Sequence, residues 1–361
     1  MNMWDLFSAG ARSIAVIGMA KNVGKTVTLN RLIHDANERK RYLGLTSIGR
    51  DGEEYDVVSG EEKPSITALP GTLLATTDQC LFQSQARAEV LETTRHNTSM
   101  GQVIIVRVRQ QGRIQLAGPA DNTSLVDVCH RMLKHGADSV LVDGALDRKA
   151  SASPAVTEAG VLVTGAALAR DMDQVVEATA HQASLFNLPA FTPGSAGLRM
   201  EHVEGSSGDS LTDMLTALTE KQAVGIINEE GSVRKLDIPT FLGSGAEVGR
   251  QIQKKDQAIL VRGSVTETAV NEMLDTAEAV EQLTVVVEDA TRIFVTPRQW
   301  RIWSKRNLRL RVVKQISLMM VTVNPWSPGG WFFDGERFVD RIRQAVHPVP
   351  AVNVMGREDQ V

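Results

Sequence analysis

Several residue types and patterns that mark other protein classes are scarce in this 361-residue chain. Only two cysteines occur, Cys80 and Cys129, without the spacing of a metal site, which indicates packing thiols in a reducing cytosol. No apolar run approaches the roughly 20 residues that a membrane-spanning helix needs. The first residues lack a basic segment followed by an apolar core, so we expect no signal peptide. These absences predict a cytoplasmic protein that does not enter a membrane.

Charge of one sign is not concentrated in the chain either. There are 39 basic and 43 acidic residues, a net charge of −4, and no block rich in lysine or arginine. Proteins that bind nucleic acid regardless of its sequence need such a block to contact phosphates, so we expect no nucleic-acid partner. The hydrophobic fraction of 42% is ordinary for a globular protein, and the length allows two domains.

The most specific pattern lies in residues 14–27, where a short apolar run and a glycine-containing turn precede Gly24-Lys25-Thr26. This is the form of a phosphate-binding P-loop. The backbone N–H groups of such a loop converge on phosphate oxygens at the positive end of the following helix dipole. Lys25 is predicted to reach the β- and γ-phosphates of a nucleotide, and Thr26 to place its hydroxyl on Mg²⁺.

One departure from the usual P-loop spacing is that Met19 stands where the first glycine is expected, with Gly18 one residue earlier. That first glycine mainly permits a tight turn, whereas Gly24 allows the backbone to approach phosphate closely. The alternative, a chance Gly-Lys-Thr on a surface loop, is disfavoured by the strand pattern before it and the helix pattern after it. The residues expected to contact the nucleotide are Ala20, Lys21, Asn22, Val23, Gly24, Lys25, Thr26 and Val27.

Two aspartates follow predicted strands near the P-loop. Asp51 comes shortly after one apolar run, and Asp143 ends another in the manner of a Walker B element. With Thr26 they are the predicted Mg²⁺ ligands, and with Lys25 the predicted catalytic residues. Each has a simpler alternative, namely a solvated polar turn for Asp51 and a plain strand-end turn for Asp143.

Weaker candidates for phosphate or substrate contacts lie close to these aspartates. They are the acidic residues Glu53 and Glu54 and the polar residues Asp147, Arg148 and Ser151. All five are equally compatible with ordinary connecting loops. Residues 243–249 form a second glycine-rich segment, but it contains no lysine, so a flexible turn before a helix is favoured over a second phosphate loop.

Three motifs together resemble a known class of nucleotide-binding proteins. They are Ala-Lys-Asn-Val-Gly-Lys-Thr (20–26), Thr-Ser-Ile-Gly-Arg-Asp-Gly-Glu (46–53) and Val-Asp-Gly-Ala-Leu-Asp-Arg-Lys-Ala-Ser-Ala-Ser-Pro (142–154). The first resembles the P-loop of dethiobiotin synthetase and of the molybdopterin-guanine-dinucleotide accessory protein. More narrowly, all three resemble the P-loop reactivase subunit that accompanies adenosylcobalamin-dependent lysine-5,6-aminomutase and ornithine aminomutase. The resemblance covers residues 12–166 and, more weakly, 321–354.

That resemblance implies ATP hydrolysis coupled to exchange of damaged cobalamin in a partner aminomutase, with a second ATPase subunit as a further partner. The residues themselves predict an ATPase that uses ATP and Mg²⁺ and acts as a switch protein. ATP is favoured over GTP because no guanine-reading [Asn/Thr]-Lys-x-Asp motif occurs. Two alternatives remain open: a P-loop kinase or synthetase acting on a small metabolite, and a nucleotide-binding module that does not hydrolyse.

Strand and helix patterns alternate along the chain, which predicts an α/β fold. We expect a P-loop NTPase three-layer domain with a mostly parallel sheet at residues 1–200. A smaller α/β region at residues 201–361 is expected to serve partner docking or regulation. The predicted linker is the stretch rich in glycine, serine and proline at 189–208. The alternative is that the C-terminal half adds strands to the same sheet.

An aromatic-rich segment stands out near the C-terminus, at residues 324–338. Trp326, Trp331, Phe332 and Phe333 lie there beside two prolines and two glycines. Aromatic side chains on a kinked loop suit either docking of a partner protein or the cover of a planar ligand. The alternative is a loop that folds back and caps its own domain.

Overall fold

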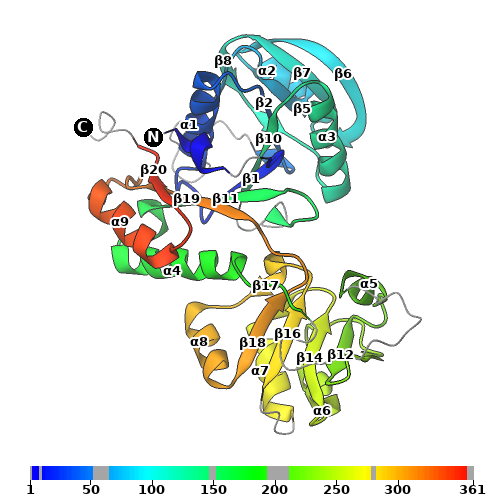
Figure 1. Ribbon diagram of the computed structural model, residues 1–361. Helices are drawn as coiled ribbons and strands as arrows, with labels where there is room; N and C mark the ends of the chain where they lie inside the picture. Colours follow the sequence, from blue (N-terminus) through cyan, green and yellow to red (C-terminus); the bar gives the residue numbers. More distant parts are fainter. Residues whose placement is uncertain are drawn as a thin grey trace. The chain divides into compact units, whose positions relative to one another are not determined.

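The computed structural model describes residues 2–7, 10–51, 65–145, 152–192, 211–277 and 282–355 (Figure 1). It divides the chain into two compact units. Unit 1 combines Met1–Ala183 with Ser317–Val361, and unit 2 is Ser184–Ile316. Within the described residues, no helix is both long enough and apolar enough to cross a membrane.

Unit 1 is built on a large, mostly parallel sheet, which confirms the predicted α/β class. Its described strands follow the order β20-β19-β11-β1-β10-β2-β5-β7-β6. All neighbours from β20 to β5 are parallel, whereas β7 is antiparallel to both β5 and β6. The strands are β1 Ser13–Gly18, β2 Leu43–Ser47, β5 Leu73–Thr77, β6 Arg87–Thr98, β7 Gly101–Gln110, β10 Ser139–Ala145, β11 Ala159–Gly165, β19 Leu318–Asn324 and β20 Ala351–Asn353.

Helices cover both faces of this sheet, and Figure 1 shows α1 and α3 on opposite sides of the strands. The reason is visible in β10, where successive side chains point to opposite faces. Leu141 packs in one core cluster with Leu29 and Leu32 of α1, whereas Val140 and Val142 pack in a second cluster with α3. The helices are α1 Lys25–Glu38, α2 Asp78–Gln83, α3 Asn122–Lys134, α4 Met172–Phe186 and α9 Gly335–Val346.

The expected division at residue 200 differs from the structure, because the last segment of the chain returns to the first sheet. Strand β19 pairs in parallel with β11, with Thr164 opposite Val323 and Gly165 opposite Asn324. Strand β20 then pairs with β19. Residues 317–361 therefore belong to unit 1, and unit 2 is an insertion. The physical reason is that hydrophobic alternation identifies strands but does not specify their partners, here more than a hundred residues apart.

Unit 2 has a smaller α/β sheet of its own, whose described strands follow the order β13-β12-β14-β16-β18. Strands β14, β16 and β18 are parallel, and β12 is antiparallel to its neighbours. The strands are β12 Val224–Asn228, β13 Val233–Leu236, β14 Asp256–Val261, β16 Leu283–Val287 and β18 Leu308–Val312. The helices are α5 Leu211–Thr216, α6 Gly245–Gln251, α7 Glu267–Thr276 and α8 Pro297–Lys305.

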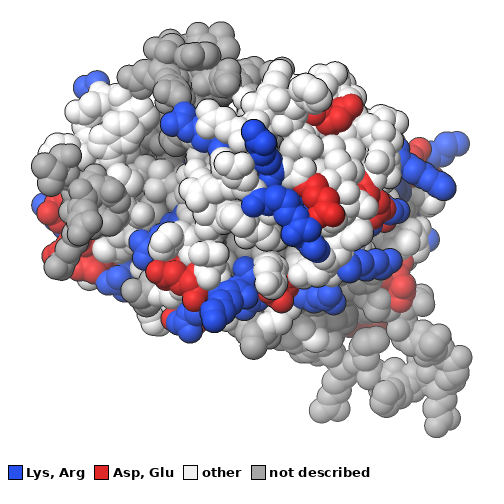
Figure 2. Space-filling view, turned by 90° about the horizontal axis from the view of Figure 1, so that it is seen from above, with Lys and Arg blue, Asp and Glu red and all other residues white. Residues whose placement is uncertain are grey.

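Charged side chains tie the long edge strand β6 of unit 1 to helix α3. Glu92 on β6 pairs with Arg131 and lies 2.8 Å from the ring nitrogen Nε2 of His135. Asp127 on α3 accepts a hydrogen bond of 2.7 Å from Arg131 and lies 2.8 Å from Nε2 of His96. Across the face shown in Figure 2, basic and acidic side chains are likewise interspersed. These contacts join opposite charges in pairs.

Candidate functional site

The loop that joins β1 to α1, residues 19–24, is here called the glycine loop. It begins at the carboxyl end of β1, a buried strand between β10 and β11. The backbone turns through Asn22 and Gly24, which have φ angles of 62° and 99°. Asparagine and glycine are the residues that adopt this left-handed conformation most readily. The turn thus uses residues whose chemistry suits it.

Met19 explains why the unusual spacing of the motif is tolerated. Its φ angle is not positive, so position 19 does not require glycine. Its backbone N–H donates a 2.9 Å hydrogen bond to the carbonyl oxygen of Val163 on β11. Its side chain is buried. Met19 therefore anchors the start of the glycine loop to the neighbouring strand.

Gly24 precedes the first residue of α1, and two features require a glycine there. Its φ angle is left-handed, and an added Cβ would lie 2.7 Å from Cβ of Asn324. Gly165 at the end of β11 is equally crowded, since a Cβ there would lie 2.7 Å from the carbonyl oxygens of Val23 and Asn324. The ends of β11 and β19 therefore close tightly on the glycine loop.

Lys25 and Asp143 form an ion pair beside this loop. The distance from Nζ of Lys25 to Oδ1 of Asp143 is 3.1 Å, and their side chains are 18% and 6% exposed. Two elements set this distance: α1 begins at Lys25, and β10 places Asp143 opposite Val16 of β1. Gly24 has no side chain that could cap the first N–H groups of α1. Lys25, the first residue of α1, adds its positive charge at the same helix end. The structure thus brings two of the three predicted catalytic residues together.

The other predicted residues divide into three groups. Ala20, Lys21 and Asn22 are exposed on the glycine loop, Val23 is buried, and Thr26 and Val27 are half-buried in the first turn of α1. Asp51 lies in the short strand β3, Arg50–Asp51, which pairs with β9, Leu116–Ala117, and its side chain lies outside the described residues. The weaker candidates Glu53, Glu54, Asp147, Arg148 and Ser151 also lie outside them, as does 193–208 of the predicted linker.

Sequence reasoning missed Asn324 as part of this neighbourhood. It is the last residue of β19, is buried, and lies against Gly24 and Gly165. Its side-chain oxygen accepts a 3.1 Å hydrogen bond from the backbone N–H of Trp326. The signal available in the sequence was an apolar strand that ends in a polar residue before a proline. The missing step was the pairing of β19 with β11.

The aromatic segment follows Asn324, and its members fall into two groups. Trp331 donates its indole N–H to the carbonyl oxygen of Ala166 at 3.0 Å, and Phe333 packs edge-on against Phe338. Trp326 and Phe332, by contrast, are 49% and 76% exposed. The segment therefore caps its own unit through Trp331, Phe333 and Phe338, and it presents Trp326 and Phe332 to solvent.

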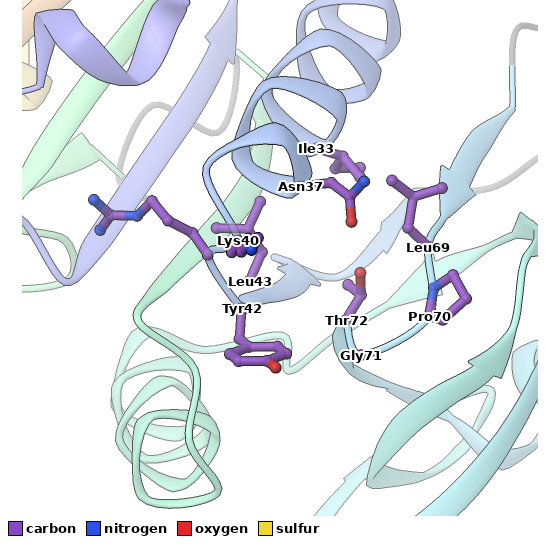
Figure 3. A pocket seen from close by; sticks show the side chains of 10 residues that line it. Ile33, Asn37, Lys40, Tyr42, Leu43, Leu69, Pro70, Gly71 and Thr72 are labelled. Atoms are coloured by element: carbon purple, nitrogen blue, oxygen red, sulfur yellow. The ribbon is translucent and has the colours of Figure 1, made fainter.

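A cavity of about 250 Å³ lies at the other end of the sheet (Figure 3). Ile33 and Asn37 from the last turns of α1 line it, together with the segments 40–43 and 69–72. These segments lead into β2 and β5, so the cavity is at the amino edge of the parallel strands. Ligands of open α/β sheets bind at the carboxyl edge. This cavity is therefore separate from the glycine loop.

The carboxyl edge of four adjacent parallel strands, β19, β11, β1 and β10, brings together the residues of this site. They are Lys25, Asp143, Gly24 and Asn324. The arrangement offers a positive helix end, a lysine and a buried carboxylate, which can bind an anion and a cation side by side. Comparison with protein-family models, with curated proteins and with solved structures finds no match to this chain.

Proposed function

We propose that this chain binds Mg²⁺-ATP at the glycine loop and hydrolyses it, as an ATPase with a P-loop NTPase domain. The observation that carries the proposal is the 3.1 Å pair of Lys25 and Asp143 at the amino end of α1. Such a helix end attracts anions, because its first N–H groups and its dipole both favour negative charge. Lys25 adds a full positive charge at the same place.

The glycine loop fits the phosphates of a nucleotide. Gly24 has no side chain that could cover its backbone N–H, and its φ angle is left-handed. The exposure of Ala20, Lys21 and Asn22 leaves the outer side of the loop open to a ligand. Lys25 begins α1 and is predicted to contact the β- and γ-phosphates. The phosphate chain would then follow the loop to Lys25.

Asp143 fits the metal that accompanies such phosphates, since carboxylate and hydroxyl oxygens are the ligands that Mg²⁺ prefers. Thr26 and Asp51 are the other proposed ligands. When bound, Mg²⁺ neutralises charge on the β- and γ-phosphates. Lys25 would turn from Asp143 toward the phosphates, and the carboxylate would then hold the ion or one of its waters.

We further infer that hydrolysis serves as a switch for a partner protein. The support is the resemblance of segments 20–26, 46–53 and 142–154 to the reactivase subunit described above. The partner would then be an adenosylcobalamin-dependent aminomutase, assisted by a second ATPase subunit. A kinase or synthetase would instead turn over only with a small acceptor, and a binding module would hold ATP without turnover.

The decisive measurement is Mg²⁺-ATP affinity by titration calorimetry, combined with phosphate release in the absence of any acceptor. Lys25→Ala removes a charge-assisted contact to phosphate and should weaken binding by about 1–3 kcal/mol. Lys254→Ala is the matched control, because this exposed lysine follows the second glycine-rich segment in unit 2. Equal affinity of wild type and a folded Lys25→Ala variant would overturn the nucleotide site.

A further inference from the structure

The Lys25–Asp143 pair defines a direction for the proposed nucleotide. Asp143 comes from β10, so the terminal phosphates would lie on the β10 side of β1. The nucleoside end of the molecule must then extend away from β10. On the other side of β1 lie β11 and, about 10 Å from β1 at ordinary strand spacing, β19. The loops that follow these two strands are therefore the neighbours of the base.

The loop after β19 starts directly against the glycine loop. Asn324 lies within 3 Å of the position that a Cβ of Gly24 would take, and it also crowds Gly165. Two hydrogen bonds then fold the loop into a short hairpin: Ser327 N–H donates to Trp331 at 3.0 Å, and Phe333 N–H to Pro325 at 2.9 Å. We call residues 324–333 the aromatic hairpin. The first residue of the aromatic hairpin therefore lies against the glycine loop.

Trp331 fixes the far end of the aromatic hairpin. Its indole N–H bonds to Ala166, the residue after Gly165, and the guanidinium of Arg170 lies 5.0 Å from its ring centre. An added Cβ on Gly329 would lie 1.9 Å from the Trp331 ring, which shows how closely the hairpin folds over it. Trp331 thus holds the aromatic hairpin on the loop after β11.

The exposed rings of Trp326 and Phe332 do not hold the aromatic hairpin in place as Trp331 does. They face each other across an antiparallel bridge, and residues paired in this way project from the same face. Half of Trp326 and three quarters of Phe332 remain exposed. Each aromatic side chain offers an apolar surface of 150–250 Å² in general, so leaving two of them side by side in water is unfavourable without a ligand.

We propose that Trp326 and Phe332 cover the base of the nucleotide bound at the glycine loop. This inference rests on the proposed function. A base is a flat, polarisable ring, and stacking on an aromatic side chain is the general way to bind its face. A protein partner fits this surface less well, because two side chains fall far short of the roughly 800 Å² per partner in a stable interface. The aromatic hairpin is therefore assigned to the ligand.

The test separates the base from the phosphates by comparing two ligands, Mg²⁺-ATP and inorganic triphosphate with Mg²⁺. Trp326→Ala and Phe332→Ala should each weaken ATP binding by about tenfold. Triphosphate has no base, so its affinity should stay unchanged in both variants. Trp326→Phe keeps an aromatic ring and should retain most of the ATP affinity. Phe294→Ala, at a half-exposed aromatic residue of unit 2, is the control.

A second readout is the fluorescence of Trp326. Stacking of a base on the indole should quench the emission of the wild type on addition of ATP, and Trp326→Phe should lose that change. The base cover is overturned if wild type binds ATP, Lys25→Ala weakens it, and both hairpin variants bind ATP as wild type does. If wild type binds neither ligand, the nucleotide site itself is wrong. Melting curves show whether each variant is folded. Phe332→Ala should disturb folding least, because it removes the more exposed of the two rings.

Discussion

Glycine occurs at the start of a helix in both units, but its structural role differs between them. In unit 1, Gly24 is left-handed and precedes α1 beside a lysine and an aspartate. In unit 2, Gly245 and Gly249 lie within α6, where an added Cβ would meet carbonyl oxygens of α7 at 2.0 and 2.4 Å. These glycines allow two helices to pack closely. The second glycine-rich segment is therefore a packing feature within a helix, whereas its sequence favoured a flexible turn before a helix.

A buried aspartate of each unit shows the same contrast. Asp143 of unit 1 lies at the carboxyl edge of its sheet and faces Lys25. Asp256 of unit 2 begins β14, where it accepts hydrogen bonds from Arg234 at 3.0 Å and from the Gln253 N–H at 2.8 Å. The start of a parallel strand is not where α/β sheets bind ligands. Location, more than residue type, distinguishes a site from a structural ion pair.

The largest expected effect follows from this pair of aspartates. Asp143→Asn should retain ATP binding but reduce phosphate release by about 100-fold or more. The reason is that an amide is a poor substitute for a carboxylate that holds Mg²⁺ or one of its waters. Asp256→Asn should leave turnover unchanged and lower the free energy of unfolding by about 1–2 kcal/mol, through a weakened charged hydrogen bond. Steady-state phosphate release and urea unfolding measure the two effects. Wild-type turnover in Asp143→Asn would show that Asp143 holds no metal ion needed for hydrolysis.

Glycine substitutions give a smaller contrast. Gly24→Ala forces an alanine into a left-handed conformation, which costs about 1–2 kcal/mol. It also presses on Asn324, so ATP affinity of the folded protein should fall about tenfold or more. Gly249→Ala should leave that affinity unchanged and destabilise unit 2 by about 1–3 kcal/mol through overpacking against α7. Calorimetric titration and thermal unfolding compare the variants, and loss of ATP binding in Gly249→Ala at full stability would contradict the assignment.

Much of the fold could be predicted from local patterns. Val140, Leu141 and Val142 form an apolar run, and such runs alternating with helices indicate a buried parallel sheet. Strand β19 was not predicted, and neither was its position in the first sheet. Pairing of β19 with β11 is a contact between distant segments. No local propensity specifies such a partner.

The candidate site shows the same limit. The Gly24-Lys25-Thr26 motif could be recognised from the sequence alone, because its turn residue, its lysine and its hydroxyl group are consecutive in the chain. Asp143 could be proposed only because a strand ending in aspartate follows a convincing loop, and the 3.1 Å distance to Lys25 depends on β10 lying beside β1. Asn324 depends on a return of the chain after an inserted unit, so it was found only in the structure.

The smallest expected effect concerns pH and the charged contacts between β6 and α3 of unit 1. The hydrogen bond with His135 is the main cause that lowers the pKa of Glu92 below its ordinary value of 4.5. The hydrogen bond from Arg131 is the main cause that lowers the pKa of Asp127 below 3.8. A carboxylate with a lowered pKa stabilises the folded protein above its unfolded pKa. That stability is lost as pH falls through the folded pKa.

We therefore expect melting temperature to decline as pH drops from about 5 toward 3, since the two ordinary values of 4.5 and 3.8 mark the upper end of the window. The double variant Glu92→Gln/Asp127→Asn should melt slightly lower at neutral pH and show a shallower decline. Its effect should be modest, because these side chains are partly exposed and screened by solvent. Unit 2 has the buried Asp256 with Arg234, so Asp256→Asn serves as the comparison. A decline in the double variant as steep as in wild type would assign the acid sensitivity to other carboxylates.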